Sequence, residues 1–202
     1  MARPRRHTDD ELLDVARAVF LEHGPSASLQ RVAELVGMSQ PALFKRFGTK
    51  EAFLVRALAP SAQLPWVERL HAGPDERPLP EQLTEICLGA MEFFAVSIPC
   101  VMTLRASGID LAALHLDEGP TSPLRMRQAL HAFFAAARDR GLLRAVPPER
   151  IDLVLVGSLQ SRALAAHVMG ERLGRAEIEA HAAAVVDLLW NGLRPPTTES
   201  FE

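Results

Sequence analysis

The sequence has few of the residue patterns from which disulfide, metal and catalytic sites are built. It contains no tyrosine and only two cysteines, Cys87 and Cys100, which show neither a pairing pattern nor metal-ligand spacing. We expect both to be buried thiols in a reducing compartment, with redox sensing as the alternative. The seven histidines never pair at a one-turn spacing, and no glycine-rich phosphate loop or nucleophile motif occurs. These absences argue against an enzyme, and we expect no metal and no cofactor.

Long apolar runs are also lacking. No segment approaches the roughly 18 uninterrupted apolar residues that a bilayer-spanning helix needs, and the amino terminus lacks the apolar centre of a secretory signal. Hydrophobic residues nevertheless make up 48% of the chain, which is ample for a buried core. We therefore expect a cytoplasmic protein with no membrane partner.

The net charge of -3 at pH 7 hides an uneven distribution of acidic and basic residues. In residues 1–58 the basic side chains outnumber the acidic ones, and they gather in an arm from Arg3 to Arg6 and around Lys45 to Lys50. Clusters of lysine and arginine can hold a phosphate backbone. The charge of this segment favours a nucleic-acid partner, although the average charge of the chain does not.

The first predicted helix is marked at both ends. Thr8 and Glu11 form a capping box, in which each side chain accepts a hydrogen bond from the backbone of the other. Apolar residues then recur at steps of three and four up to Phe20, and Gly24 with Pro25 ends the pattern. The sequence therefore predicts an amphipathic helix between Thr8 and Gly24.

Three shorter helices follow, separated by capping residues and glycines. Ser28 caps the second, which ends at Gly37, and Ser39 caps the third, residues 40–47. A fourth helix covers residues 50–58. Two helices joined by a short turn with glycine are typical of a helix-turn-helix, whose second helix enters the major groove of DNA. By local geometry alone an ordinary helical hairpin fits equally well.

The remaining sequence predicts further helices, interrupted in two places. Prolines crowd residues 59–80, which indicates a linker and short turns. Helical periodicity follows from Leu83 to near Pro99, and again from Pro123 to before Gly141. Between these two helices, residues 101–119 are less regular and are expected to form a wall of a pocket.

The last two predicted helices are the best defined of this half. They run from Pro148 to Met169 and from Arg175 to Trp190, and both have broad apolar faces. Small residues on the first of them allow another helix to approach closely. The fold class predicted for the chain is all-α, with about nine helices.

Residues 12–58 resemble the amino-terminal domain of the tetracycline-repressor (TetR) family. The resemblance is carried by Ala16-x-x-x-Phe20 and His23-Gly24 in the first helix, by Gly37-Met38-Ser39 at the turn, and by LFKRFGTKE from Leu43 to Glu51. It implies a homodimer with a three-helix, helix-turn-helix DNA-binding domain, here residues 1–58. It also implies a ligand-binding and dimerisation domain, here 59–194, and we expect residues 195–202 to be a disordered tail.

The function implied by this resemblance is sequence-specific transcription regulation. We expect a repressor that leaves a palindromic double-stranded DNA operator when an unidentified small-molecule effector binds the carboxy-terminal domain. An activator, or a DNA-binding dimer regulated by a protein partner, is the alternative.

By position, the resemblance assigns DNA contacts to three successive helices. These positions are Ser28, Gln30 and Arg31, then Ser39, Gln40, Pro41, Phe44 and Arg46, then Thr49 and Lys50; Lys45 joins them because of its charge. Amides such as that of Gln40 can read adenine, whereas the cations suit phosphates. Phe44 stands where the family usually has tyrosine and has no hydroxyl to offer a phosphate, a loss that Arg46 is expected to offset.

The resemblance also places an effector among the middle helices and a twofold four-helix bundle at the end of the chain. Candidate pocket residues are Met91, Phe94, Met102, Leu104, His115, Phe133, Phe134 and His167, for which core packing is the alternative. Candidate dimer residues are Ile151, Leu155, Ser158, Leu159, Arg162, Ile178, Ala182, Val185 and Leu189, for which a helix pair buried within one subunit is the alternative. The arm from Arg3 to Arg6 either enters a minor groove or is a disordered tail.

Overall fold

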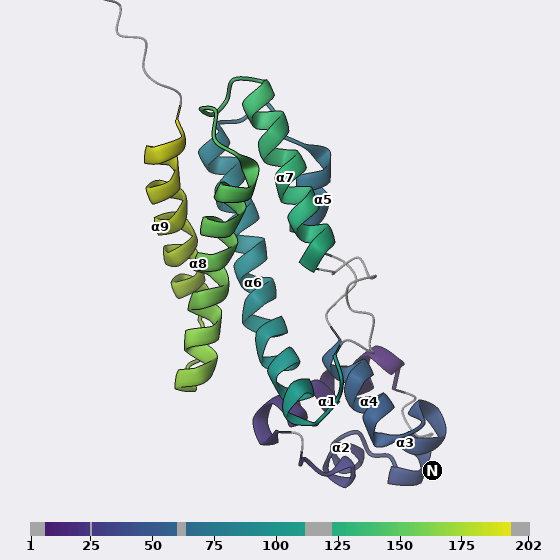
Figure 1. The fold of residues 1–202 in the computed structure, drawn as a ribbon. Helices are drawn as coiled ribbons and strands as arrows, with labels where there is room; N and C mark the ends of the chain where they lie inside the picture. Colours follow the sequence, from purple (N-terminus) through teal and green to yellow (C-terminus); the bar gives the residue numbers. More distant parts are fainter. Residues whose placement is uncertain (1–6, 25, 60–63, 112–122, 195–202) are drawn as a thin grey trace, which may run out of the picture. The chain divides into compact units, whose positions relative to one another are not determined.

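The computed structural model describes residues 7–24, 26–59, 64–111 and 123–194 (Figure 1). Within these ranges the chain forms nine α-helices and no strand, which confirms the predicted all-helical class. Contacts divide the chain into two compact units, one of residues 1–60 with 99–115 and the other of residues 61–98 with 116–202. The arm from Arg3 to Arg6 and the expected tail, 195–202, lie outside the described residues.

The first unit contains four short helices and the end of a long one. They are α1 (Asp9–His23), α2 (Leu29–Leu35), α3 (Gln40–Phe47), α4 (Lys50–Leu58) and the last part of α6 (Leu79–Ala106). The predicted capping box at α1 is present, with the Glu11 backbone N–H 3.2 Å from Oγ1 of Thr8 and the Thr8 N–H 3.0 Å from a carboxylate oxygen of Glu11. Local side-chain chemistry therefore fixes where α1 begins.

The turn between α2 and α3 is closed by backbone hydrogen bonds. Gly37 has a φ of +66°, a conformation that costs glycine no steric strain. The N–H of Met38 donates to the Ala33 carbonyl at 2.9 Å, and that of Gly37 donates to the Glu34 carbonyl at 3.2 Å. These bonds satisfy carbonyls at the end of α2, as in a Schellman motif. The turn is therefore short and fixed, as a helix-turn-helix requires.

The core of the first unit includes residues from both of its chain segments. Phe20 and Phe53 are fully buried, and Cys100 and Leu104 of α6 are buried in the same cluster. The expected second domain, 59–194, therefore differs from the observed division, because the end of α6 packs with the amino-terminal helices. Sequence periodicity does not reveal which core a helix end joins.

The second unit is a set of helices around a separate core. It comprises α5 (Pro65–Ala72), the first part of α6, α7 (Pro123–Asp139), α8 (Pro148–Met169) and α9 (Arg175–Leu193). Figure 1 shows α9 alongside α8, and α7 alongside both α5 and α8, in agreement with the contacts between these pairs. The predicted starts of α8 and α9 are confirmed, and α9 continues to Leu193.

Two predictions about this half of the chain are wrong. The proline-rich segment 59–80 contains a helix, α5, because Pro65 occupies its first turn, where a missing N–H costs nothing, and Trp66 and Leu70 are buried. The helix expected to end near Pro99 continues to Ala106. Burial of Cys100 and Leu104 beyond the proline stabilises this continuation and opposes the helix-breaking effect of proline.

Helix α6 is long and apolar enough to span a membrane by length and composition alone. An 18-residue window in it has a mean hydropathy of 1.8, and 44% of that window is buried inside the protein. Polar residues such as Glu85, Glu92 and Ser97 interrupt its apolar runs, so no uninterrupted apolar run marks this helix in the sequence. Leu83, Ile86 and Met91 of α6 are fully buried in the second unit, so the apolar composition fits a core helix.

Both cysteines are buried thiols, as predicted. Burial raises the pKa of the Cys87 thiol to about 12. Burial likewise raises the pKa of Cys100 to about 11, against a smaller lowering effect of the Arg17 charge. Thiolate is the reactive form of cysteine, so neither side chain is suited to redox chemistry in the folded protein.

Candidate functional site

Helix α3 presents a polar face to solvent. Oγ of Ser39 accepts the Ala42 N–H at 3.3 Å, which confirms the predicted cap. Because a hydroxyl can donate and accept together, Ser39 keeps its proton available for a phosphate. Gln40 in the first turn is half-buried, and Pro41 beside it is exposed. Phe44 is 40% exposed, so its ring is not part of the core.

Two lysines near this face are available to a phosphate backbone. Lys45 in the last turn of α3 is exposed, and Lys50 at the start of α4 is half-buried. Neither lysine forms a salt bridge with another of the described residues. Thr49 caps α4 by accepting the Ala52 N–H at 3.1 Å. Hydrogen bonds from its own backbone N–H and from the Thr49 side chain lower the pKa of Glu51, and the charge of Lys50 adds a smaller lowering effect.

Arg46 is held by the start of α1, which the sequence did not predict. Its Nε donates to Oδ1 of Asp9 at 2.5 Å, and its Nη1 donates to the His7 carbonyl at 3.0 Å. Nη2 of Arg56 in α4 lies 3.2 Å from the other oxygen of Asp9. One carboxylate thus joins α1, α3 and α4. Arg46 is already paired with Asp9, so a phosphate would have to compete with this carboxylate for its guanidinium and the expected role of Arg46 as a substitute phosphate contact is weakened.

The candidate contacts on α2 cluster around one acidic side chain. Nε2 of Gln30 donates to Oε1 of Glu34 at 3.2 Å, and Nη1 of Arg31 lies 3.9 Å from the other oxygen. Ser28 caps α2 by accepting the Gln30 N–H at 3.1 Å. All of these side chains are exposed. The carbonyl oxygen of the Gln30 amide remains available as an acceptor for a base edge.

The structure does not bring the expected pocket residues together. Met91, Phe133 and Phe134 are fully buried in the core of the second unit. Leu104 is in the core of the first unit, whereas Met102 is exposed. His167 is half-buried at the end of α8, and His115 lies outside the described residues. Of the expected set, only Phe94 borders a cavity of the second unit, one that lies beside Trp66 and Met126.

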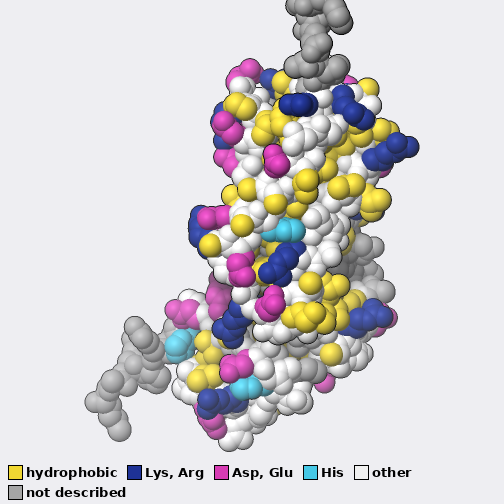
Figure 2. Space-filling view, turned by 90° about the vertical axis from the view of Figure 1, so that its left-hand side faces the viewer, with side chains coloured by type: hydrophobic (Ala, Val, Ile, Leu, Met, Phe, Trp, Pro, Cys, Tyr) yellow, Lys and Arg dark blue, Asp and Glu magenta, His cyan; other side chains and the backbone are white. Residues whose placement is uncertain are grey.

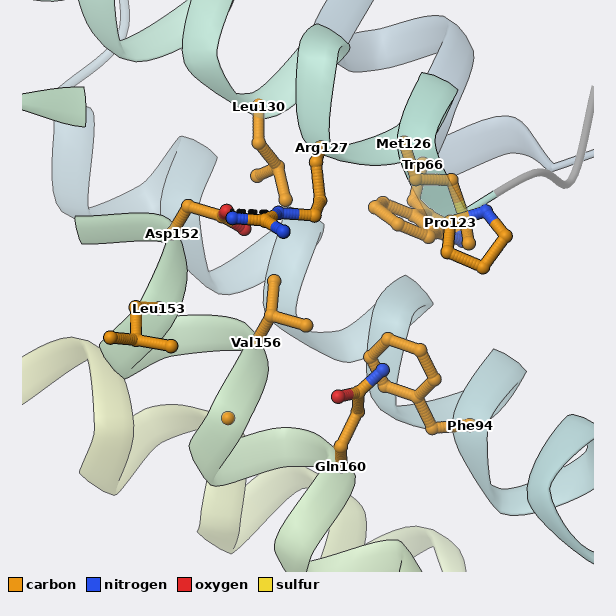
Figure 3. A pocket seen from close by; sticks show the side chains of 11 residues that line it. Trp66, Phe94, Pro123, Met126, Arg127, Leu130, Asp152, Leu153, Val156 and Gln160 are labelled. Atoms are coloured by element: carbon orange, nitrogen blue, oxygen red, sulfur yellow. Dashed lines mark hydrogen bonds and ion pairs between the residues drawn. The ribbon is translucent and has the colours of Figure 1, made fainter. Parts of the chain in front are cut away.

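That cavity has a volume of about 270 Å³ and lies among α5, α6, α7 and α8 (Figure 3). Its walls include Trp66, Phe94, Met126, Leu130 and Val156. Trp66 was missed because the prolines around it predict a linker. The other lining residues were missed because an apolar face on a helix has the same pattern whether it lines a cavity or fills a core.

Most of the expected dimer residues are packed inside the subunit. Six are buried in the core of the second unit, namely Ile151, Leu155, Leu159, Ile178, Ala182 and Val185. Ser158 and Arg162 are half-buried and face α9, where Oγ of Ser158 lies 3.4 Å from Nε2 of His181. Leu189 is half-buried against the same core. These faces join α8 to α9 and to the rest of the unit, so they are not exposed for contact with another chain.

The surface that remains on these two helices is apolar and contains small residues. We call it the α8–α9 face, and its exposed members are Val154, Gly157, Ser161 and Val168 of α8 with Ala184 and Leu188 of α9. Leu188 is 76% exposed and Val168 is 69% exposed. Figure 2 views the side of the molecule that carries α8 and α9, where hydrophobic side chains are interspersed with charged ones. Exposed leucine and valine on adjacent helices are typical of an interaction surface.

Among the described residues, no group of three or more His, Cys, Asp or Glu side chains is arranged to hold a metal ion. Two candidate sites remain among the described residues, the exposed polar face of α3 in the first unit and the cavity beside Trp66 in the second.

Comparisons with known proteins match the first of these features. Residues 12–57 match the family model described as bacterial regulatory proteins, tetR family. A relative from Escherichia coli strain K12, the HTH-type transcriptional repressor BdcR, is 27% identical over 111 residues, which are 53% of this chain and 55% of the relative. The match therefore spans about half the length of that relative.

Solved structures share the fold over nearly the whole chain. A TetR-family transcriptional regulator from Mesorhizobium loti has a TM-score of 0.70 at 18% identity, over 93% of this chain and 96% of that one. The TetR transcriptional regulator SCO0520 from Streptomyces coelicolor has a TM-score of 0.58 at 25% identity, over 94% of this chain and all (100%) of that one. The matched segment 12–57 contains the capped turn that exposes α3, and by this segment the chain carries the DNA-binding domain of the tetR family of bacterial regulatory proteins.

Proposed function

We propose that this protein is a homodimeric repressor that binds a palindromic operator and is released from it by a small molecule. The observation that carries this proposal is the exposed polar face of α3, which follows a closed turn and bears Gln40 and Lys45. A helix in this arrangement reads the major groove. The protein acts in the cytoplasm, where bacterial DNA lies, and catalyses no reaction.

The DNA-contacting side chains divide into two roles. Gln40 reads a base, because its amide can bond adenine at two atoms, and Gln30 supports it from α2. Ser39, Lys45 and Lys50 hold phosphates and thereby set the position of α3 without specifying the sequence. Ser28, Arg31 and Thr49, which flank α3 in the first unit, also contact phosphates. Pro41 and Phe44 offer apolar contact to thymine methyls and sugars.

A dimer doubles this reading surface. We place the second subunit on the α8–α9 face, because the exposed Val154, Val168 and Leu188 would be buried there. Two α3 helices separated by one DNA turn, about 34–36 Å, fit successive major grooves of a palindrome. An effector then needs only to prefer the arrangement that cannot span both half-sites, with a coupling free energy of about 1–3 kcal/mol.

Footprinting of the purified full chain on DNA that flanks its own gene tests the proposal directly. We expect a protected palindrome, and a fall in protection when the effector is added. Protection of no site in the flanking DNA would instead favour a protein whose helical surfaces bind another protein.

The two roles on the reading surface predict different effects of two alanine substitutions. Gln40→Ala is expected to cost about 1–3 kcal/mol and to relax sequence preference at one operator position. Lys50→Ala is expected to weaken binding to all sequences evenly and to lower the salt slope by about 1. Fluorescence anisotropy with single-base operator variants at several salt concentrations measures both. Equal, sequence-independent losses for the two variants would contradict the division of roles.

The three-way contact at Asp9 predicts a gain of DNA affinity on its removal. Asp9→Asn removes the negative charge that pairs with the guanidinium groups of Arg46 and Arg56, so binding to non-operator DNA is expected to strengthen. The salt slope is expected to steepen by about 1 to 2, because each new phosphate contact adds about 0.9. The matched control is Asp10→Asn, which makes the same change of net charge in the same turn of α1. If both variants behave alike, the effect belongs to net charge and not to the Asp9 contacts.

A further inference from the structure

The cavity of the second unit contains an unusual buried carboxylate. Asp152, in the first turns of α8, is 1% exposed, and its side chain belongs to the lining of the cavity. A charged group that is removed from water in this way normally has a partner for each oxygen. One oxygen of Asp152 has partners and the other has none, so the site is chemically incomplete.

The partnered oxygen is held by two side chains of α7. Oδ2 accepts a hydrogen bond from Nε of Arg127 at 2.8 Å and lies 3.1 Å from Nε2 of His131. Figure 3 shows the carboxylate directed towards Arg127, with Val156 and Leu130 nearby. The guanidinium neutralises the negative charge of Asp152 on that side. An additional cation in the cavity would therefore meet Arg127 and gain little.

The second oxygen, Oδ1, is buried and has no hydrogen-bond partner within the described part of the chain. Because a carboxylate oxygen only accepts hydrogen bonds, the group that would complete this site is a donor. A ligand carboxylate or phosphate would place a second negative charge against Oδ1 and is disfavoured. At Oδ1 the cavity thus favours a neutral donor such as a hydroxyl or an uncharged amine, and Arg127 and Gln160 are the other polar side chains of the lining.

The rest of the cavity determines the polarity and the size of the remainder of the ligand. Trp66, Phe94, Met126 and Leu130 provide apolar and aromatic walls, which suit a hydrophobic molecule. The volume of about 270 Å³ lies just below the range of about 300–1,000 Å³ that is usual for small-molecule sites. This size favours a molecule with a single substituted ring over a long-chain or multi-ring compound.

We infer that the cavity binds a small, neutral, single-ring molecule whose hydroxyl or amine group donates a hydrogen bond to Oδ1 of Asp152. This inference rests on the proposed function, because it specifies the chemical class of the effector that releases the protein from DNA. It assigns Asp152 as the residue that selects the donor, with Arg127 and His131 as positioning residues that orient its carboxylate.

Three compounds that share an ethyl-substituted benzene ring test the inference on the unmodified protein. 4-Ethylphenol offers a hydrogen-bond donor, ethylbenzene offers no polar group, and 4-ethylbenzoate offers an anion. We expect 4-ethylphenol to bind at least about tenfold more tightly than ethylbenzene, since a hydrogen bond to a charged acceptor is lost in the latter. We expect 4-ethylbenzoate to bind more weakly than 4-ethylphenol. Isothermal titration calorimetry of the full chain gives the three affinities.

The indole N–H of Trp66 reports where the compounds bind. Nε1 of Trp66 is buried without a hydrogen-bond partner among the described residues, so its nitrogen–proton NMR signal is sensitive to a nearby ligand. The chain has two tryptophans, and Trp190→Phe identifies which signal is which. We expect 4-ethylphenol to shift the Trp66 signal. A shift confined to Trp190 would overturn the proposed location.

A pair of matched variants isolates the role of the carboxylate. Asp152→Leu removes the acceptor and is expected to abolish the preference for 4-ethylphenol over ethylbenzene. Asp187→Leu makes the same change at an exposed position of α9 and is expected to keep that preference. If Asp152→Leu fails to fold, the three-compound series on the unmodified protein still decides the matter. Equal affinities for 4-ethylphenol and ethylbenzene, or tightest binding of 4-ethylbenzoate, would overturn the inference.

A separate anisotropy measurement on operator DNA distinguishes this inference from the function on which it rests. If 4-ethylphenol binds at Trp66 with the expected preference but does not release DNA, the ligand class holds and the proposed release fails. If a charged or purely apolar compound releases DNA and 4-ethylphenol does not bind, the ligand class fails and the proposed repressor function stands.

Discussion

Changing Val154 and Leu188 together to aspartate is expected to convert a dimer into a monomer. Val154 is 56% exposed and Leu188 is 76% exposed in the single subunit, and both lie on the α8–α9 face. A twofold interface on this face would bury four new carboxylates without partners, a cost of several kcal/mol for each ion. Dissociation separates the two reading helices. The loss of simultaneous half-site binding is expected to lower operator affinity by about 10² to 10⁴.

Sedimentation velocity measures the mass of the variant, and anisotropy measures its affinity for the operator. The matched control changes Val96 and Leu124 to aspartate, because these residues of the second unit are 52% and 59% exposed and lie on α6 and α7. The control pair is expected to remain dimeric and to keep its affinity for DNA. A dimeric Val154 and Leu188 variant, or a monomeric control, would show that the subunits meet elsewhere.

The beginnings of α1 and α3 could be predicted from the sequence because their determinants are local. The Thr8–Glu11 capping box and the Ser39 cap each involve residues within one helical turn, and both hydrogen-bond patterns are present. The same is true of the glycine turn at Gly37. Short-range hydrogen bonds of this kind depend little on the rest of the fold.

The errors arose where distant contacts outweigh local preference. Pro99 lies inside α6 because residues on both sides of it are buried, although proline alone favours a break. Pro65 starts a helix within a segment that its proline content assigned to a linker. The contact between Arg46 and Asp9 joins residues 37 positions apart, which no local pattern can indicate.

The choice between core and interface could not be predicted for α8. This helix has apolar residues on more than one face, so periodicity alone does not tell which face packs within the subunit. Ile151, Leu155 and Leu159 turned out to be buried there, whereas Val154 and Val168 are exposed. The cavity was hidden for a related reason, because the orphaned oxygen of Asp152 is visible only once α7 and α8 are placed together.

Phe53→Ala is expected to destabilise the first unit by about 3–5 kcal/mol, a large part of the 5–15 kcal/mol that stabilises a typical domain. Phe53 is 1% exposed. The centroid of its ring lies 4.6 Å from the ring centroid of Phe47 at the end of α3. It lies 6.3 Å from the ring centroid of Phe20 in α1, and these two rings meet edge to face. Removal of this ring leaves a cavity where α1, α3 and α4 meet, so the reading helix loses its support and DNA binding falls with stability.

Phe44→Ala provides the matched control, since it removes the same side chain from an exposed position, 40% accessible, in the same unit. Substitution of an exposed residue usually changes stability by no more than about 0.5 kcal/mol. Amide hydrogen exchange of α1 to α4 measures the stability of the first unit separately from that of the second. We expect protection to fall in Phe53→Ala and to persist in Phe44→Ala, whose DNA affinity is nevertheless reduced by the lost ring contact. If both variants kept full protection, the aromatic cluster would not be what fixes α3, and the capped turn alone would have to hold the reading helix in place.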